Sequence, residues 1–235
     1  NVLGKTEVPV HGFNSPIVWQ QRIFMTGADS QGQEVMCFDA GSGEQLWMTT
    51  VETAVEMPDV TPDTGYAAPT MATDGERVFA IFASGELAAL DFEGNIVWQK
   101  NIGVPGNPYG MASSLISDGR RLFVQYDHQE TQQVVAFDCA SGKRAWQMAR
   151  SKISWSSPSL IETDGGLQLV LNDEEHATAY DPATGEQLWQ VACLGGEVAP
   201  LPGVLVQVVE LLGAVQIQRV LPLLRAHHAP GRRGL

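Results

Sequence analysis

Cysteine is scarce in this chain, which has three, at positions 37, 139 and 193. They form no Cys-x-x-Cys motif and no adjacent pair, so a cysteine-based zinc site or redox site is excluded. We therefore expect Cys37, Cys139 and Cys193 to be small buried apolar side chains, and we predict no metal site.

Basic residues are also few. The chain has 14 Lys and Arg against 27 Asp and Glu, with a formal net charge of −13. Recognition of phosphates requires clustered Lys and Arg, so this balance excludes a general nucleic-acid binder.

Long hydrophobic runs are absent too, and none reaches the roughly 18 residues of a membrane-spanning helix. No secretory signal opens the chain at Asn1, and a leader that has been lost would leave the same start. We predict no membrane span.

Turn residues are plentiful, with 24 Gly and 13 Pro, and one unit is repeated. Residues 38–47, 90–98, 137–146 and 180–189 each contain an Asp, a short turn with Gly, and a Trp. The tryptophans recur at intervals of 51, 48 and 43 residues. Repeats of this length with strand-like composition indicate the blades of a β-propeller.

Each copy also opens with two residues drawn from Ser, Ala and Pro, which come shortly before its first apolar residues. In the fourth copy, 159–162, 167–172, 177–181 and 187–192 are predicted to be strands, separated by turns rich in Asp, Pro and Gly. The Asp of each unit can accept hydrogen bonds from the amides of its own turn.

The Asp-x-x-Thr/Ser-Gly-x-x-x-Trp unit resembles the blade signature of propellers of the pyrroloquinoline-quinone (PQQ) type. That family includes quinoprotein dehydrogenases and the propeller lipoprotein of outer-membrane assembly. The resemblance covers about residues 12–202 and implies that the repeat Trp docks one blade on the next; ligand stacking is the alternative role. The residues expected to dock blades are Asp39, Gly43, Trp47, Asp91, Gly94, Trp98, Asp138, Gly142, Trp146, Asp181, Gly185 and Trp189.

The predicted fold is an all-β propeller region over residues 1–200 with four four-stranded blades. Blades are expected at about 12–51, 65–103, 108–150 and 153–193, and a fifth starts at 195. Members of the resembled family have seven or eight blades, so the array is expected to be part of a larger propeller.

The region 201–235 departs from the repeat. All 27 acidic residues lie at or before Glu210, and no further Trp unit follows. This divergent tail is either the product of a reading-frame error or a genuine apolar strand or helix that caps the array.

A ligand site is expected where the chain enters each blade, because these loops surround the propeller axis on one face. Aligning the blades on the Pro of each start places one large or charged residue three positions before it, and Asn14 and Ser156 one position further in. The candidate ligand-binding residues are Phe13, Asn14, Tyr66, Met111, Trp155, Ser156 and Glu197. The alternative is that these side chains only pack the axial channel.

Other polar groups have simpler explanations. The acidic connection 52–64 is expected to be a solvated loop, with calcium binding as the alternative. Asp127 with His128, and 173–176, are expected to be exposed turn residues. No Gly-x-Ser-x-Gly motif accompanies the histidines, and we predict no catalytic residue.

Function follows from the resemblance. It implies a non-catalytic scaffold in the bacterial periplasm, or otherwise outside the cytoplasm, that binds a protein or small ligand through inter-blade loops. A fragment of a PQQ-dependent dehydrogenase and a sensor module of a larger protein are the alternatives. No cofactor is expected except PQQ with calcium under the dehydrogenase alternative, which would require the adjacent cysteines that this sequence lacks.

Four blades of this wide type would form an open arc with apolar end faces. We therefore predict that the isolated chain self-associates or aggregates, or pairs with the remaining blades of its propeller. Size-exclusion chromatography and thermal melting test this expectation. A monodisperse monomer that melts cooperatively would contradict it.

Overall fold

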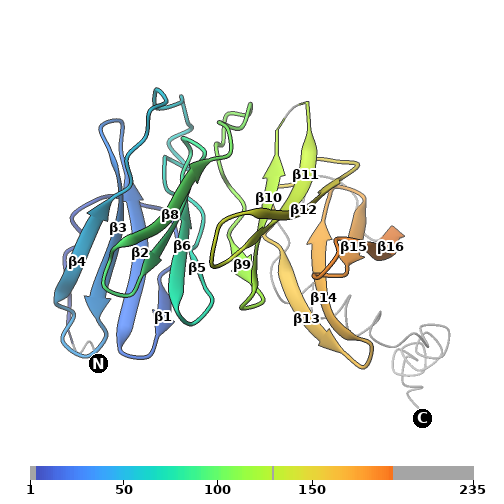
Figure 1. The fold of residues 1–235 in the computed structure, drawn as a ribbon. Helices are drawn as coiled ribbons and strands as arrows, with labels where there is room; N and C mark the ends of the chain where they lie inside the picture. The colour runs from blue at the N-terminus through green and yellow to red at the C-terminus, as the bar shows by residue number, and fades with distance from the viewer. Residues whose placement is uncertain (1–3, 129, 193–235) are drawn as a thin grey trace, which may run out of the picture.

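The structure, a computed structural model, describes residues 4–128 and 130–192. The described residues contain sixteen strands in four antiparallel four-stranded sheets, and in each sheet the strands follow in chain order (Figure 1). Blade one contains β1 (Ile17–Trp19), β2 (Arg22–Ala28), β3 (Gln33–Asp39) and β4 (Gln45–Thr50). Blade two contains β5 (Ala72–Thr73), β6 (Arg77–Ile81), β7 (Glu86–Asp91) and β8 (Ile96–Asn101). Blade three contains β9 (Ile116–Ser117), β10 (Arg121–Asp127), β11 (Gln132–Asp138) and β12 (Arg144–Ala149). Blade four contains β13 (Ser159–Thr163), β14 (Gly166–Asn172), β15 (His176–Tyr180) and β16 (Gln187–Ala192).

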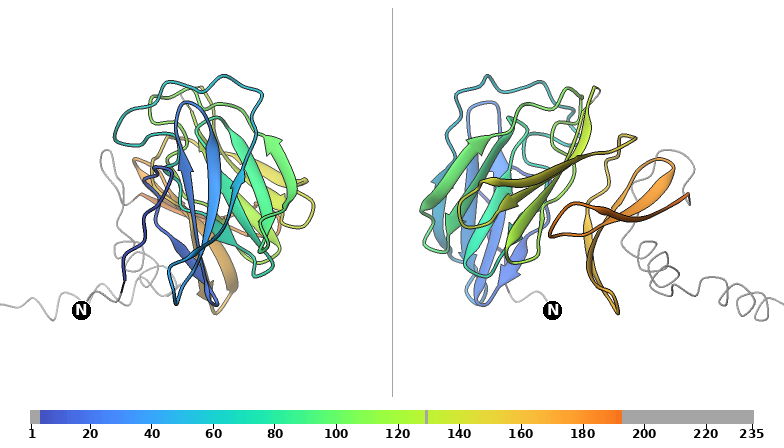
Figure 2. Two further views of the ribbon diagram at one scale, coloured as in Figure 1. Left: turned by 90° about the vertical axis from the view of Figure 1, so that its left-hand side faces the viewer. Right: turned by 45° about the vertical axis from the view of Figure 1, so that its right-hand side comes forward.

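The four sheets stand side by side in an array that turns about one axis, as the two further views show (Figure 2). This arrangement confirms the predicted all-β propeller class and its four four-stranded blades. The predicted strands of blade four agree with the observed ones to within one residue at every end. The fifth blade start and the tail 201–235 lie outside the described residues. No helix in the described part could cross a membrane.

Burial differs between the middle and the outermost strands of a blade. In blade two, β7 is buried along nearly its whole length because neighbouring blades cover both of its faces. The outermost strands β4, β8, β12 and β16 share one alternating pattern of exposed and half-buried residues. The repeat Trp occupies a half-buried position of that pattern.

The turn before each outermost strand is shaped by its Asp. The Oδ1 atom of Asp39 accepts hydrogen bonds from the backbone N–H groups of Gly41 and Ser42, at 3.0 and 2.7 Å. Hydrogen bonds from Ser42, the backbone one first, hold the pKa of Asp39 below its ordinary value. In blade three, the Ser141 side chain has the same effect on the pKa of Asp138.

The tryptophans of blades one to three contact the next blade through its turn. Each indole N–H donates to a backbone carbonyl there: Trp47 to Phe92 at 2.9 Å, Trp98 to Cys139 at 2.8 Å and Trp146 to Pro182 at 3.0 Å. Trp189 instead donates to Oε1 of Gln168 in its own blade, at 2.8 Å. The hydrogen-bonded indole can therefore be half-buried without leaving its N–H unsatisfied.

A glycine of the next turn lies directly beneath each of these three indoles. A Cβ atom built on Gly94, Gly142 or Gly185 would lie 2.7–2.8 Å from Cδ2 of the overlying indole. The same glycines have positive φ angles of 64–89°. Glycine is thus required at these turns both by the backbone conformation and by the closeness of the indole.

Buried phenylalanines line the inner side of the first three indoles, a feature that the repeat signature did not reveal. Phe24, Phe79 and Phe123 lie 5.8–5.9 Å from the indole of their own blade, centroid to centroid. Each inter-blade apolar cluster contains such a pair of rings.

The indole-on-glycine contact is tested by comparing two glycines of blade three. Gly142→Ala would place a methyl group against Trp98, whereas Gly119 also has a positive φ, of 87°, but nothing within 4 Å of its Cβ position. Both variants bear the left-handed backbone cost of about 1–2 kcal/mol. We expect Gly142→Ala to lower the free energy of unfolding by a further 1–3 kcal/mol or so, measured by urea denaturation. Equal losses in the two variants would contradict the docking role.

Candidate functional site

The entry loops of the four blades are aligned by strand pairing. In each blade, the repeat Trp pairs with one residue of the third strand. That residue pairs with one residue of the second strand, which itself pairs with one residue of the first strand. This path ends at Ile17, Ala72, Ile116 and Ser159 in blades one to four. These four positions are structurally equivalent.

This register corrects the alignment on proline. Pro16 and Pro158 each precede an equivalent residue by one position, but Pro69 precedes Ala72 by three. In blade three the residue aligned with these prolines, Ser114, lies two positions before Ile116. The prolines misled because a residue without an N–H is tolerated at any entry position that needs no donor.

Phe13 and Trp155 are equivalent in the corrected register, whereas Tyr66 and Met111 are not equivalent to them. Tyr66 is half-buried against the apolar cluster of blades one and two. Met111 is only 5% exposed and belongs to the cluster of blades two and three. Glu197 lies outside the described residues. The structure therefore brings an exposed Phe13 and a half-buried Trp155 to matching loops, which belong to blades one and four.

The two aromatic side chains have different supports. The Phe13 side chain is 51% exposed, and its ring lies over Gly65, whose Cβ position is 2.9 Å from Phe13 Cε2. The Trp155 ring meets Tyr109 edge to face, with centroids 4.8 Å apart. Each ring is held by a neighbouring loop and still presents part of its surface.

Asn14 and Ser156 have partners inside the protein. Asn14 donates through Nδ2 to the carbonyls of Thr26 and Ala67, at 2.7 and 3.1 Å. Ser156 is buried, and its carbonyl accepts a hydrogen bond from Oγ of Ser113 at 2.8 Å. These two polar groups stabilise the entry loops on which the aromatic rings stand.

Hydrogen bonds to Ser and Thr hydroxyl groups link each blade to the next, and we call this series the hydroxyl relay. Its residues lie two positions before the four equivalent strand residues. The Ser15 N–H donates to Thr70 Oγ1, the Thr70 N–H to Ser114 Oγ, and the Ser114 N–H to Ser157 Oγ, at 3.0–3.1 Å. Sequence reasoning missed this relay, although a Ser or Thr near every blade start was its signal. It joins the innermost parts of all four described blades.

A buried ion pair within blade three contacts blade four through its hydrogen bonds, contrary to the expectation of exposed turn residues. The carboxylate of Asp127 pairs with the guanidinium of Arg150, and both side chains are 3% exposed. Asp127 also accepts a hydrogen bond from the Ser154 N–H at 3.0 Å, and Arg150 donates to the carbonyl of Asn172 at 2.6 Å. Burial raises the pKa of Asp127, and Arg150 opposes this rise.

Asp173 is likewise buried, and its Oδ1 atom accepts hydrogen bonds from the N–H groups of Glu175 and His176 at 2.9 and 2.7 Å. Its carboxylate thus shapes the turn between β14 and β15 in the way that Asp39 shapes its own. His128 and His176 are half-buried.

The remaining candidates are the cysteines and the acidic loop 52–64. Cys37 and Cys139 are buried and free, as predicted, and burial raises the pKa of each thiol to about 11. Cys193 lies outside the described residues. The carboxylates of the 52–64 loop are exposed. Within 4–128 and 130–192, no three His, Cys, Asp or Glu side chains are grouped as metal ligands would be.

Blades docked by an indole on the next turn define a tryptophan-docked β-propeller of the quinoprotein type. A sequence profile described as "Outer membrane protein assembly factor BamB" matches residues 3–126 and 130–211. The chain belongs to this family.

Solved structures share the fold at low sequence identity. BamB from Moraxella catarrhalis superimposes with a TM-score of 0.52 at 16% identity, covering 79% of this chain and 50% of that one. Quinohemoprotein alcohol dehydrogenase from Comamonas testosteroni gives a TM-score of 0.56 at 14% identity, covering 80% and 36%. A europium-containing methanol dehydrogenase gives 0.56 at 14% identity, covering 79% and 41%. The chain thus spans half of these structures or less. No curated protein sequence matches it.

The buried ion pair yields a test. We expect Arg150→Gln to lower the free energy of unfolding by about 3–5 kcal/mol at pH 7, because the Asp127 carboxylate would stay buried without its partner. The folded-state pKa of Asp127 is already raised, and losing Arg150 raises it further, so the loss should shrink as the pH falls and Asp127 is protonated.

The control is Lys152→Gln, which removes an exposed ion pair with Glu175 that spans 3.5 Å. Its effect should stay below about 1 kcal/mol at either pH. Chemical denaturation at pH 7 and pH 4 measures both variants, and a pH-independent loss for Arg150→Gln would refute the role of the buried charge.

Proposed function

We propose that this chain is part of a non-catalytic propeller scaffold that binds a protein or a small ligand through the entry loops on its axial face. The observation that carries the proposal is the exposed ring of Phe13 and the partly exposed ring of Trp155 on equivalent loops. Aromatic side chains on rigid loops offer a large contact area at little entropic cost, and they are enriched at protein interfaces.

The rigidity of these loops supports binding. The hydroxyl relay and the Asn14 hydrogen bonds hold the loop backbones, so the rings are preorganised and a partner meets a defined surface. Membership of the BamB family favours a protein partner in outer-membrane assembly and a location outside the cytoplasm.

Site-specific photocrosslinking tests the proposal. With p-benzoylphenylalanine in place of Phe13 or of Trp155, irradiation of bacterial cells that export the protein should give a discrete crosslinked product with one envelope protein. The control position is Val97, an apolar side chain of the outermost strand β8 that is 48% exposed. Equal crosslinking from Val97, or none from the two loop positions, would overturn the proposed face.

The competing hypothesis is a fragment of a PQQ-dependent dehydrogenase. We expect no saturable change in absorbance when the purified chain is titrated with PQQ and Ca²⁺. Stoichiometric binding of PQQ would defeat the non-catalytic proposal whatever the crosslinking shows. The third hypothesis is a sensor module of a larger protein that binds a small ligand, for which we expect no crosslinked envelope protein from Phe13 or Trp155.

A further inference from the structure

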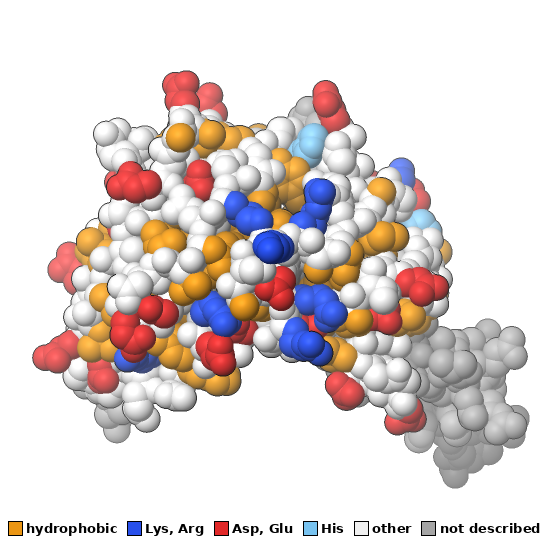
Figure 3. All heavy atoms as spheres, in the orientation of Figure 1, with side chains coloured by type: hydrophobic (Ala, Val, Ile, Leu, Met, Phe, Trp, Pro, Cys, Tyr) orange, Lys and Arg blue, Asp and Glu red, His pale blue; other side chains and the backbone are white. Residues whose placement is uncertain are grey.

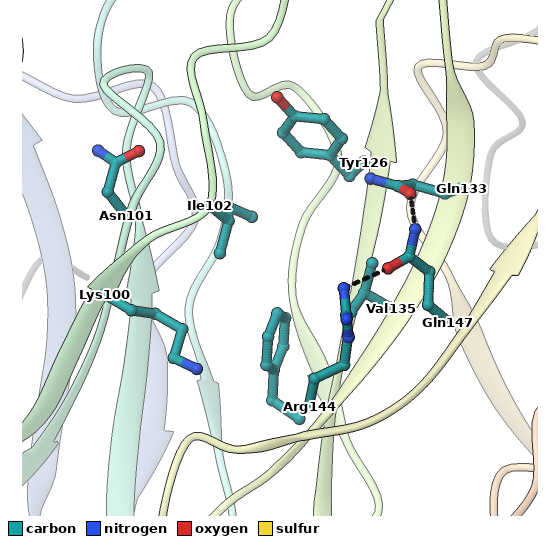
Figure 4. A pocket seen from close by; sticks show the side chains of 9 residues that line it. Lys100, Asn101, Ile102, Tyr126, Gln133, Val135, Arg144 and Gln147 are labelled. Atoms are coloured by element: carbon teal, nitrogen blue, oxygen red, sulfur yellow. Dashed lines mark hydrogen bonds between the residues drawn. The ribbon is translucent and has the colours of Figure 1, made fainter.

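A groove of about 320 Å³ opens between blades two and three, beside the outermost strands β8 and β12 (Figure 4). Its apolar lining comes from Tyr126, Val135 and Phe137 of blade three and from Ile102, which follows β8 of blade two. Lys100 enters from β8 and Arg144 from β12, so that two different blades contribute its cationic groups. Small-molecule sites are typically concave and of about this size or larger, and they combine apolar side chains with placed polar groups.

The two cations in this groove have no acidic partner. Lys100 donates to the carbonyl of Gly142, and its Nζ lies 4.9 Å from the centre of the Phe137 ring. Arg144 donates through Nη1 to Oε1 of Gln147 at 2.6 Å. No lining residue is Asp or Glu, and neither cation forms an ion pair within the described parts of the chain.

This arrangement stands out in a chain with 27 acidic and 14 basic residues. Figure 3 shows several Lys and Arg side chains in the middle of one face, with a few carboxylates among them, while most other carboxylates on that face lie toward its edges. The lining of the groove, with two cations and no carboxylate, is therefore locally positive on an acidic protein, which favours an anion over a cation or a neutral molecule.

The other described interfaces provide an internal comparison. Their positions equivalent to Lys100 and Arg144, two residues after and two before the repeat Trp, are Thr49 with Ile96 and Met148 with Gln187. At the first interface the position equivalent to Gln133 is Glu86, a buried carboxylate. The cationic pair thus belongs to one interface and is not required by blade docking.

We propose that this groove binds an organic carboxylate that carries an apolar body. The guanidinium of Arg144 and the ammonium of Lys100 suit the carboxylate, through charge-assisted hydrogen bonds. The faces of Phe137 and Val135 suit the apolar body, and the amide of Gln147 suits a further polar group. The site is separate from the axial face, so either proposal can fail without the other.

Ligand-observed saturation-transfer NMR on the full chain tests the site, since it tolerates self-association. The probe is 3-phenylpropionate, and its comparison is 3-phenylpropionamide, which has the same shape without the charge. We expect saturable transfer with the acid and affinity at least about tenfold lower for the amide, since charge-assisted hydrogen bonds are about twice as strong as neutral ones.

The matched variant borrows residues from other blades of the same chain. Lys100→Thr with Arg144→Gln installs the side chains of equivalent positions, and a threonine there can bond the turn carbonyl as Thr49 bonds that of Gly94, at 2.8 Å. This double variant should fold, as its thermal melt would verify, and should bind the acid at least about tenfold more weakly. Arg120→Gln, which removes an exposed cation outside the groove, should leave binding unchanged.

Three results would overturn the proposal: no saturable binding of the acid, equal binding of acid and amide, or equal loss in Arg120→Gln and in the double variant. Displacement of 3-phenylpropionate by inorganic phosphate at the same concentration would also overturn it. Phosphate has no apolar body, so such displacement would mean that the site recognises charge alone.

Discussion

The structure depends on one contact, an indole that lies on a glycine turn of the next blade and donates its N–H to a carbonyl there. At the second interface this contact involves Trp98, Gly142 and the carbonyl of Cys139. The indole supplies a large apolar area, the glycine admits it at van der Waals distance, and the hydrogen bond fixes its orientation. A distance of 2.7 Å between the built Cβ and the ring leaves no space for a side chain at the turn, so the spacing of the blades is set within narrow limits.

Because this contact holds each pair of blades, the rest of each interface is free to vary. The first interface contains the buried Glu86, which accepts hydrogen bonds from Thr53 and Asn101. The second contains the cationic groove, and the third the buried pair of Asp127 and Arg150. Three different polar arrangements therefore occupy one geometry. This is how a repeated scaffold acquires distinct surfaces without a change in its backbone.

The local features of this fold could be predicted from the sequence, because turns and strands repeat over short distances. Asp181, Gly185 and Trp189 mark a turn and its outermost strand within nine residues, and the predicted strands of blade four agree with the observed ones. Features that join separate segments could not. Arg150 lies 23 residues after Asp127, and the two are paired by the strand order of blade three and contacted by residues of blade four, neither of which a local pattern reveals. The entry-loop register failed in blades two and three because proline is not confined to one position before a strand.

The first blade shows that the docking surface of a turn has two separable parts. Gly43 has a φ of +76°, as its counterparts do, but Thr6 rather than an indole lies at its Cβ position. Thr6 donates to the Gly43 carbonyl at 2.8 Å, the same bond that Thr49 makes to Gly94. The segment around Thr6 thus makes the threonine contact of an outermost strand although it forms no strand itself and brings no Trp to the turn. The turn keeps its shape there without the indole, because its Asp39 hydrogen bonds are local. The indole accordingly sets the distance between blades, whereas the Asp and Gly set the conformation of the turn on which it lies.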